Sequence, residues 1–344
     1  MNISDLKIVF QSALILITLS LFSCEGPKTS IDLNQISVDW KFVPFHEVQY
    51  AKQKDAQLID DAIKGYPQFG KLFFSTVIPL IDLSPEQQKE ILEDPGFLSL
   101  LDTCMIIFDD VVNLKNEFDT AFKYYKYHTS DESVPNVYTF VSGFAYQNFI
   151  FSDENRDGLG IGLDMFMGSK FPYKSLDPKN PTFSQFLTQY FDKKYILRKS
   201  LLSWLDDKIP STQTGQLAEI IIRNGKIFYL LEKLLPDSSK DIILEFQPDE
   251  YEWCLQNEPE LWTYLLKNNL IYSNEFSKIN KLVNPSPSVP GIPQEAPGGV
   301  ANYIGWRIVQ DYAVRKEVPI NELIQEKDFQ KILDESKYRP RVRK

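Results

Sequence analysis

The spacing of apolar residues along the chain predicts a mixed first half and a helical second half. Apolar and polar residues alternate over Val38–Val43, which predicts a strand, and Val137–Val141 has the composition of a buried strand. Tyr146–Phe151 and Leu159–Leu163 are short β-type runs on either side of Ser152–Gly158. This arrangement predicts a hairpin, so the first half should contain a small sheet.

Elsewhere, apolar residues three or four positions apart predict helices, as over Phe108–Tyr125. Ser84-Pro85-Glu86-Gln87 is a capping box that predicts a short helix ending before Asp94-Pro95. Further helices are predicted near Phe183–Leu205, Gln216–Leu235, Asp249–Asn268, Ala301–Val314 and Asn321–Ser336. Five prolines and three glycines within the sixteen residues Asn284–Gly299 predict an extended loop there.

These segments predict an α+β fold that is predominantly helical, in which a small mixed sheet packs with many helices. No internal repeat and no clear boundary divides residues 37–344, so we expect one globular domain. It ends in a basic tail that suits either contact with anionic lipid headgroups or an ordinary solvated terminus. The basic residues of the tail are Arg339, Arg341, Arg343 and Lys344.

The N-terminus has the features of a secretion signal. Of the fifteen residues Ile8–Phe22, eleven are apolar, which is too few to span a bilayer about 30 Å thick but suits a signal-peptide core. The run ends at Leu21-Phe22-Ser23-Cys24, which resembles a lipobox, the bacterial signal whose cysteine is acylated. We expect a signal peptide over 1–23 and a tether over 24–36 that starts at lipidated Cys24. The alternative is a conventional signal peptide with an accidental cysteine.

Composition excludes several classes of protein. With 47 acidic and 37 basic side chains the net charge is −10, whereas nucleic acid binding needs clustered Lys and Arg. The only histidines are His46 and His128, and no HExxH occurs, so a three-histidine zinc site is excluded. Cys104 and Cys254 lie among apolar residues and are expected to be buried thiols. We expect no cofactor and identify no small-molecule substrate.

One predicted loop resembles half of a calcium site. Residues 153–158 fit D-x-N-x-D-G, and Asp164 stands at the twelfth position, where a bidentate Glu is usual. The flanks are predicted strands, however, and Asp, Asn and Gly also favour hairpin turns without a metal. Calcium binding by Asp153, Asn155 and Asp157 therefore stays open, with an ordinary turn as the simpler interpretation.

A series of short motifs occurs in a recognisable order. The segment Tyr251–Tyr264 contains W-C-x-x-N-E, which ends at Glu258, and then W-x-Y, which ends at Tyr264. Others are G-L-D-x-x-x-G at Gly162–Gly168, G-K-x-x-Y at Gly225–Tyr229, Leu270–Ser273, Asn284–Pro287, Pro297–Gly299, Tyr303–Val309 and Ser336–Pro340. In this order they resemble the gliding-motility lipoprotein GldB family. With the lipobox, the resemblance covers nearly the whole chain.

That family is similar in turn to a group of predicted zinc peptidases, which carry HExxH on one helix and an acid on the next. The corresponding segment here is Tyr195–Leu205, and Asn224-Gly225 stands where the later acid would be. Two imidazoles four residues apart bind zinc and a neighbouring Glu activates water, which Ile, Leu, Arg and Lys cannot do. The resemblance therefore implies a zincin-like scaffold that lacks the metal motif. A peptidase with a metal site built from acids is the remaining enzymatic alternative.

The resemblance implies a non-enzymatic, membrane-anchored lipoprotein of the gliding-motility apparatus. Such a protein would contribute to movement of surface adhesins and have a possible link to protein secretion. Its partners would be the membrane, through the lipid anchor, and other motility or secretion proteins. Because no acidic run follows Cys24, we expect the domain to face the periplasm. The alternative is a peptide-binding or chaperone-like module that uses a degenerate peptidase cleft.

The Pro-rich segment Asn284–Gly299 is the candidate docking surface, because a restricted backbone loses little entropy on binding. Candidate partner-binding residues are Asn284, Pro285, Tyr303, Trp306 and Arg307. Tyr, Trp and Arg are the residue types most enriched in binding hot spots. The alternative for Tyr303 and Trp306 is that they pack their helix into the core.

Overall fold

The computed structural model describes residues 31–53, 55, 57–131 and 133–341. The described residues from Ile36 onward belong to one compact unit. Before it, a single 3-10 turn, η2 (Leu33–Gln35), starts at Asp32, whose carboxylate accepts a hydrogen bond from the Asn34 backbone N–H at 3.1 Å. The expected signal peptide, Cys24 and the first part of the expected tether lie outside the described residues.

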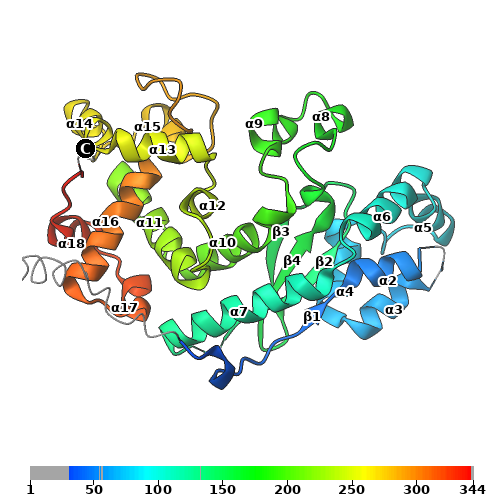
Figure 1. Cartoon of the computed structure of the whole chain (residues 1–344). Coiled ribbons are helices and arrows are strands. Elements are labelled where there is room, and N and C mark those ends of the chain that lie inside the picture. The colour runs from blue at the N-terminus through cyan, green and yellow to red at the C-terminus, as the bar shows by residue number, and fades with distance from the viewer. Residues whose placement is uncertain (1–30, 54, 56, 132, 342–344) are drawn as a thin grey trace, which may run out of the picture. The chain divides into compact units, whose positions relative to one another are not determined.

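One mixed sheet of four strands is present in the described chain, in the order β1-β2-β4-β3 (Figure 1). Its strands are β1 (Phe42–Val43), β2 (Asn136–Phe140), β3 (Asn148–Asp153) and β4 (Arg156–Gly162). β1, β2 and β4 are parallel, and β3 pairs with β4 in the antiparallel sense. The predicted mixed sheet, buried strand and hairpin are confirmed.

The first strand is shorter than Val38–Val43. The side chain of Asn136 accepts a hydrogen bond from the Lys41 backbone N–H at 2.8 Å, in place of a ladder partner. Trp40 turns toward a helix, where its indole N–H donates to Asp119 at 3.2 Å. The alternation of apolar residues therefore continues beyond the part of the segment that pairs in the sheet.

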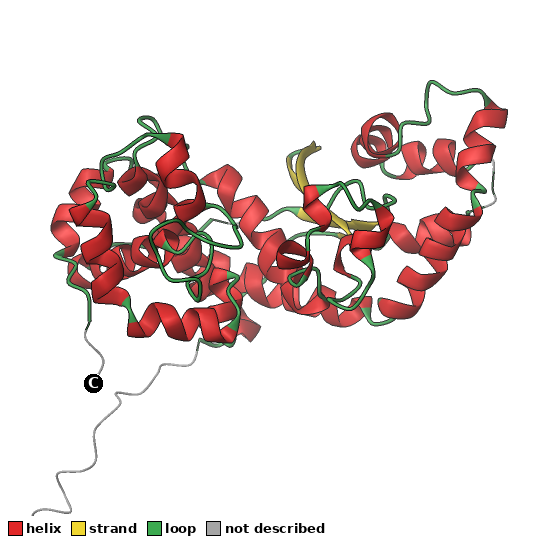
Figure 2. Ribbon diagram, turned by 90° about the horizontal axis from the view of Figure 1, so that it is seen from above, coloured by secondary structure: helices red, strands yellow, loops and turns green. Residues whose placement is uncertain are grey.

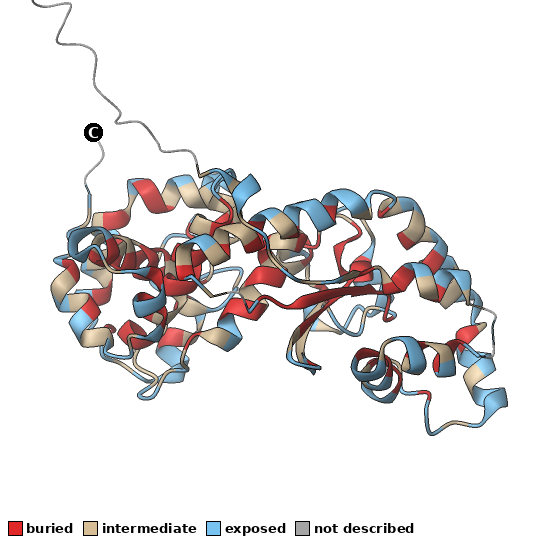
Figure 3. Cartoon of the chain, turned by 90° about the horizontal axis from the view of Figure 1, so that it is seen from below, coloured by how far each residue is buried: buried red, intermediate tan, exposed pale blue. Residues whose placement is uncertain are grey.

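Helices cover both faces of the sheet. On one face, Phe45, Phe69 and Phe73 pack against the strand residues Tyr138 and Phe140. They come from α2 (Phe45–Ala51), α4 (Pro67–Leu72) and the π-helical turn η3 (Phe73–Val77), and α3 (Leu58–Gly65) adds Leu58, Ile59 and Ala62 to the same cluster. On the other face, the larger core cluster contains strand residues such as Val137, Leu159 and Ile161, and β2 is buried along its whole length (Figure 3).

The helices predicted in the first half are confirmed at α5 (Pro85–Leu92) and α7 (Val111–Thr129). Ser84 caps α5 in a capping box, and Asp110 caps α7 by accepting from the Asn113 backbone N–H at 3.0 Å. Between them, α6 (Pro95–Ile107) was not predicted. Phe118, Phe122 and Tyr125 of α7 are buried, but Val112, which also contributes to the apolar spacing that predicted this helix, is 66% exposed.

After β4 the described chain forms helices and loops but no strand, and Figure 2 shows how far helices predominate over strands in the described structure. After β4 come η4 (Leu163–Phe166), α8 (Tyr173–Leu176), η5 (Pro181–Phe183), α9 (Gln185–Thr188), η6 (Lys193–Tyr195), α10 (Ile196–Lys208), α11 (Leu217–Leu234) and α12 (Lys240–Leu244). They are followed by α13 (Pro248–Gln256), α14 (Glu258–Lys267), α15 (Phe276–Val283), α16 (Ala301–Lys316), α17 (Ile320–Gln325) and α18 (Phe329–Ser336). The predicted helices at α11 and α16 are confirmed, and Asn284–Gly299 contains no helix or strand.

Three segments predicted as single helices are divided. Within Phe183–Leu205, the Asp192 carboxylate accepts from the Lys194 backbone N–H and starts a new turn before α10. Asp249–Asn268 divides at Asn257, after which α14 begins. Asn321–Ser336 divides where Asp328 caps α18 through the Lys331 backbone N–H at 2.9 Å. In the first and third of these segments, an aspartate that fits the apolar spacing as a polar position caps a new helical turn, and the preceding helix ends before it.

Helices α11 and α16 cross at two glycines. A Cβ at Gly305 would lie 1.8 Å from the Ile221 carbonyl oxygen, and one at Gly225 would lie 2.4 Å from that of Gly305. The two backbones therefore touch, which only glycine permits. These are the glycines of the G-K-x-x-Y and Y-I-G-W motifs. Among the described helices, none is both long and apolar enough to cross a bilayer.

Candidate functional site

A cleft of about 490 Å³ lies beside helix α10. Its lining includes Leu202 of α10, Asn224 and Phe228 of α11, Tyr190 just after α9, and Pro285 of the Pro-rich segment. In Figure 1, α9 and the segment that follows α15 lie on either side of α10. The cleft thus brings the predicted docking segment together with the helix pair that the sequence resemblance singled out.

Charged side chains at this cleft neutralise one another. The Arg198 guanidinium and the Lys199 ammonium both donate to the Glu245 carboxylate, and Arg198 Nε also donates to the Ile243 carbonyl at 3.1 Å. Burial lowers the pKa of Arg198 and of Lys199. Burial opposes ionisation of Glu245, but Arg198 and Lys199 outweigh it and hold its pKa below the usual value. The cleft therefore presents a self-contained ion cluster.

Two members of this ion cluster, Arg198 and Lys199, belong to the segment Tyr195–Leu205 that the resemblance aligned with the HExxH helix of the zinc peptidases. Arg198 and Leu202, four residues apart on α10, and Asn224 on α11 all line the cleft. An ammonium and a guanidinium repel a cation, and an aliphatic side chain has no lone pair to donate. Within the described residues, no group of three or more His, Cys, Asp or Glu side chains is arranged to hold a metal ion.

The Pro-rich segment is held in place by polar contacts at its ends and centre. Asn302 Nδ2 donates to the Val283 carbonyl at 2.8 Å, and Tyr264 Oη donates to the Pro290 carbonyl at 3.0 Å. A Cβ at Gly298 would lie 2.1 Å from the Ser286 backbone nitrogen, so the two limbs of the segment touch. The segment is an ordered wall of the cleft.

The candidate partner-binding residues divide between this wall and the core. Pro285 lines the cleft, and Asn284, which precedes it, donates from its amide to the Asn280 side-chain oxygen at 2.6 Å. Tyr303 and Trp306, by contrast, are buried, with 0% and 3% of their surface exposed. They pack α16 into the core, which was the alternative for these two residues. In this conformation a partner could not reach them.

Three of the sequence motifs meet at Glu258, which is buried. Its carboxylate accepts hydrogen bonds from Tyr303 Oη at 2.7 Å and from Tyr338 Oη at 2.9 Å, and Arg307 Nε lies 3.5 Å away. These residues belong to the W-C-x-x-N-E motif, Tyr303–Val309 and Ser336–Pro340. The motifs thus build one network around a buried carboxylate, and Arg307, which is partly buried, is part of it.

The calcium-like loop is a tight turn of the β-hairpin. Asp153 pairs with Arg156 across β3 and β4, which leaves a loop of only Glu154 and Asn155. The Asp153 carboxylate accepts from Asn136 Nδ2 and Tyr138 Oη, each at 2.8 Å, and Asp157 pairs with Lys208 at 3.2 Å. The three candidate ligands therefore do not converge. The simpler interpretation, a turn, matches the structure.

The glycines after this turn serve cross-strand packing. A Cβ at Gly158 would lie 2.2 Å from the Phe151 ring, and one at Gly160 would lie 2.5 Å from the Phe149 ring. Each aromatic ring of β3 lies across the glycine directly opposite it on β4. The alternate glycines Gly158 and Gly160 therefore have a structural role in the sheet.

Buried polar groups lie at the carboxyl ends of the parallel strands without forming a catalytic set. His46 Nδ1 lies 2.8 Å from Thr139 Oγ1, and burial lowers the pKa of His46 to about 4. Asp164 instead contacts Ser142 and its neighbours. Cys104 and Cys254 are buried free thiols whose pKa values are raised by burial, so that prediction is confirmed. The hydroxyl that contacts His46, that of Thr139, is fully buried and therefore out of reach of a substrate.

Asp164, the acid of the G-L-D motif, is fully buried. Its Oδ2 accepts from the Phe144 backbone N–H at 2.5 Å and the Ser142 N–H at 3.1 Å, while Oδ1 has no hydrogen-bond partner in the described structure. Burial raises the pKa of Asp164 to about 6, against the lowering effect of these donors. Its charged form is therefore incompletely solvated.

The Asp164 carboxyl should make stability depend on pH. The folded chain keeps the Asp164 proton up to about pH 6, whereas an unfolded Asp loses it near pH 4, so folding is favoured at low pH. Relative to Asp164→Asn, the wild-type free energy of unfolding should fall by about 2–3 kcal/mol between pH 4 and pH 7. Urea unfolding across this range measures it. Exposed Asp102→Asn should show no such difference, and parallel curves for wild type and Asp164→Asn would contradict the prediction.

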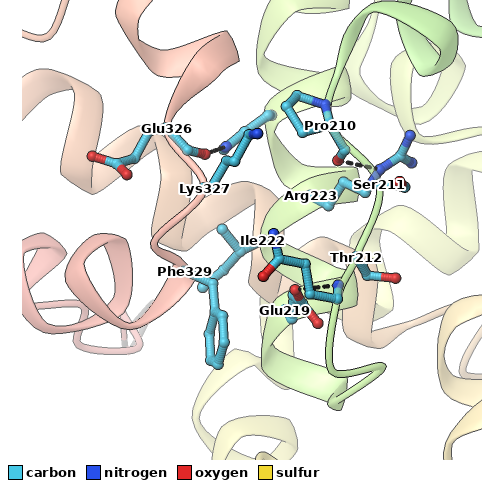
Figure 4. A pocket seen from close by; sticks show the side chains of 11 residues that line it. Pro210, Ser211, Thr212, Glu219, Ile222, Arg223, Glu326, Lys327 and Phe329 are labelled. Carbon is cyan, nitrogen blue, oxygen red and sulfur yellow. Dashed lines mark hydrogen bonds between the residues drawn. The ribbon is translucent and has the colours of Figure 1, made fainter.

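A second, much smaller cavity lies beside the G-K-x-x-Y motif (Figure 4). Its volume of about 30 Å³ suits roughly one or two water molecules. Lys226 is 5% exposed and donates to the Glu326 carbonyl at the end of α17, and burial lowers its pKa to about 8. Glu219 accepts from the backbone N–H groups of Gln213 and Thr214. This motif therefore joins α11 to its neighbours.

Two residues that line the candidate cleft, Glu245 and Arg198, were not predicted from the sequence. Nothing in their spacing relates them, because they lie on different helical segments. Glu258 and Asp164 could have been found, since both stand at fixed places in the motifs.

Comparison with known proteins gives one match. No curated protein and no solved structure matches the chain. The family model of the gliding motility protein GldB matches residues 26–340, which covers nearly the whole chain. The matched residues include the motifs that meet at Glu258, the two motifs whose glycines, Gly225 and Gly305, lie at the helix crossing, and the motif that contains Asp164. The chain therefore belongs to the gliding motility protein GldB family.

Proposed function

We propose that the protein is a non-enzymatic lipoprotein of the gliding-motility apparatus, anchored to a membrane by a lipid on Cys24 and facing the periplasm. The observation that carries this proposal is the family match over residues 26–340. The protein's role is to bind other proteins of the apparatus. The binding site is the cleft beside α10, and Pro285 and neighbouring residues of the Pro-rich segment form one wall of it. Deletion of the gene should abolish gliding and an intact copy should restore it. A deletion strain that still glides would contradict the proposal.

The ion cluster of Arg198, Lys199 and Glu245 supports the absence of enzymatic activity. Helix α10 carries two cationic side chains, Arg198 and Lys199, at the cleft. This arrangement is consistent with a zincin-like scaffold that has lost its metal. Elemental analysis of the purified protein tests this point. Zinc bound in a one-to-one ratio would contradict it and favour the peptidase alternative.

Lipidation of Cys24 should decide where the protein is found. We expect Cys24→Ala to move it from the membrane fraction to the soluble fraction, because two or three acyl chains supply the anchor. The measurement is immunoblotting of fractionated cells. The matched control is Cys104→Ala, which alters a buried thiol and should leave the protein on the membrane. Membrane retention of Cys24→Ala would contradict lipid anchoring.

The second candidate is a chaperone-like module, and the volume and apolar lining of the cleft favour it. Crosslinking in intact envelopes separates the two candidates. A fixed membrane partner supports a component of the motility apparatus. A broad set of unfolded clients supports the chaperone.

A further inference from the structure

Lys226 of α11 is a buried cation whose hydrogen-bond partner is neutral. Within the described residues its ammonium donates to one acceptor, the Glu326 carbonyl at the end of α17. An ammonium has three N–H donors, so two of them remain for a further partner. A buried charge is costly unless an opposite charge lies against it. This lysine therefore points to an anion.

The acids around this ammonium are bound to other groups. Glu326 pairs with Lys331 at 2.6 Å, and Asp206 pairs with Arg223 at 2.6 Å. Both oxygens of Glu219 accept from backbone N–H groups of the turn before α11, at 2.7 Å, 2.8 Å and 3.0 Å. Within the described residues, none of these carboxylates forms an ion pair with the ammonium. An anion from solution would supply the counter-charge that the described residues do not.

The ammonium borders the cavity of about 30 Å³ beside the G-K-x-x-Y motif (Figure 4). Ser211, Thr212 and Gln213 line this cavity too, and their side chains make no hydrogen bonds within the described part of the chain. Their hydroxyl and amide groups are neutral donors. Ile222 and Phe329 supply apolar surface. A cation, neutral donors and apolar surface are surroundings that suit a small anion.

The size of the cavity selects among anions. A water molecule needs roughly 10–15 Å³ of such space, and this cavity has about 30 Å³. Chloride, a single atom slightly larger than a water molecule, fits this volume. Sulfate, phosphate and carboxylate groups carry oxygens around a central atom and do not fit. Chloride accepts hydrogen bonds and donates none, which matches the donors of this lining.

We propose that this cavity binds a chloride ion. The Lys226 ammonium supplies the opposite charge, and the side chains of Ser211, Thr212 and Gln213 supply neutral donors. The ion would lie between α11, the segment after α10 and the end of α17, and would hold these three together. The cavity shares no lining residue with the cleft beside α10, so the inference goes beyond the proposed function and does not depend on it.

The NMR line width of chloride tests the proposal, because the line broadens when the ion exchanges with a protein site. We expect the purified protein to broaden the line in proportion to its concentration. Lys226→Met keeps the length of the side chain but removes its charge, and should weaken chloride binding by about tenfold or more. The matched control is Lys327→Met, which removes an exposed cation at the same cavity and should leave the binding largely unchanged. Circular dichroism verifies the fold of both variants.

Competing anions test the size of the site with the wild-type chain alone. Bromide, which is also a single atom, should displace chloride and narrow the line. Sulfate at the same ionic strength should not, because it is too large for a cavity of about 30 Å³. Displacement by sulfate would place the ion on exposed cations at the surface and would overturn the proposal.

The protonation of Lys226 should set the pH range of chloride binding. Burial lowers the pKa of Lys226 to about 8, Glu326 raises it and Arg223 lowers it further. The N–H groups that bind Glu219 hold the pKa of that carboxyl below its usual value, against the effect of burial, so Glu219 stays ionised. Because the neutral amine offers no charge, the Kd for chloride should rise by about tenfold between pH 7 and pH 9. The Lys327→Met variant should show the same rise.

Other outcomes would contradict the site. A chloride line that the protein does not broaden would show that water fills the cavity. Equal broadening by the wild type and Lys226→Met, or a Kd that stays constant above pH 8, would place the ion elsewhere. Each of these outcomes would overturn the proposal, and none of them bears on the motility role, which rests on the family match.

Discussion

A single methyl group at position 305 is expected to destabilise the protein by about 3 kcal/mol or more. In Gly305→Ala the new Cβ would lie 1.8 Å from the Ile221 carbonyl oxygen, which is backbone and cannot rotate away. Helices α11 and α16 would have to separate, and the core between them would lose its packing. The free energy of unfolding in urea measures the effect.

The control for this prediction is Gly65→Ala. Gly65 ends α3, and a Cβ there would meet nothing within 4 Å. Alanine also restricts the unfolded chain more than glycine does, so this variant should be neutral or more stable by up to about 1 kcal/mol. Equal stability of the two variants would show that the helix crossing is not as close as the structure indicates.

Removal of the Glu258 carboxylate is expected to cost about 3–5 kcal/mol, because it leaves buried groups without their partner. In Glu258→Ala, the hydroxyls of Tyr303 and Tyr338 lose their acceptor and the Arg307 guanidinium loses its counter-charge. Thermal and urea unfolding report the loss.

Glu260→Ala is the matched control, because Glu260 lies on the same helix and is exposed. It should change the free energy of unfolding by less than about 0.5 kcal/mol. Glu258→Gln keeps one acceptor oxygen and should fall between the two. A Glu258→Ala variant as stable as Glu260→Ala would mean that the Tyr303 and Tyr338 hydroxyls find other partners.

Apolar spacing predicted the existence of most elements well and their ends less well. The capping box at Ser84 marks the start of α5, and the apolar stripe of α11 is long enough to define that helix. Both helices were placed correctly. The divided helices show the limit of the method. Asp192 and Asp328 fit within the helical spacing as solvent-facing positions, and only the structure shows that their carboxylates cap new turns. Spacing alone does not distinguish these two roles of an aspartate.

The candidate site was predicted only in part. The proline content of Asn284–Gly299 predicted an extended loop, and Pro285 does line the cleft. The partners of that loop across the cleft, Arg198, Lys199 and Glu245, come together through tertiary packing and leave no local pattern. Tyr303 and Trp306 are residue types common in binding hot spots, but both are buried in the core. Large aromatic side chains occur in both settings, so residue type alone did not separate them.

The close crossing of α11 and α16 also constrains the order in which the protein can fold. Its two glycines, 225 and 305, are separated in the sequence by α12 to α15 and the Pro-rich segment. Contacts between such distant residues form slowly, because a long loop must close first. While the chain is being synthesised, α11 can pack against α7 and α10, but it lacks its contacts with α16 until that helix has been made. The packing of the helical half is therefore completed only after residue 316 has been made, so the core around this crossing forms late.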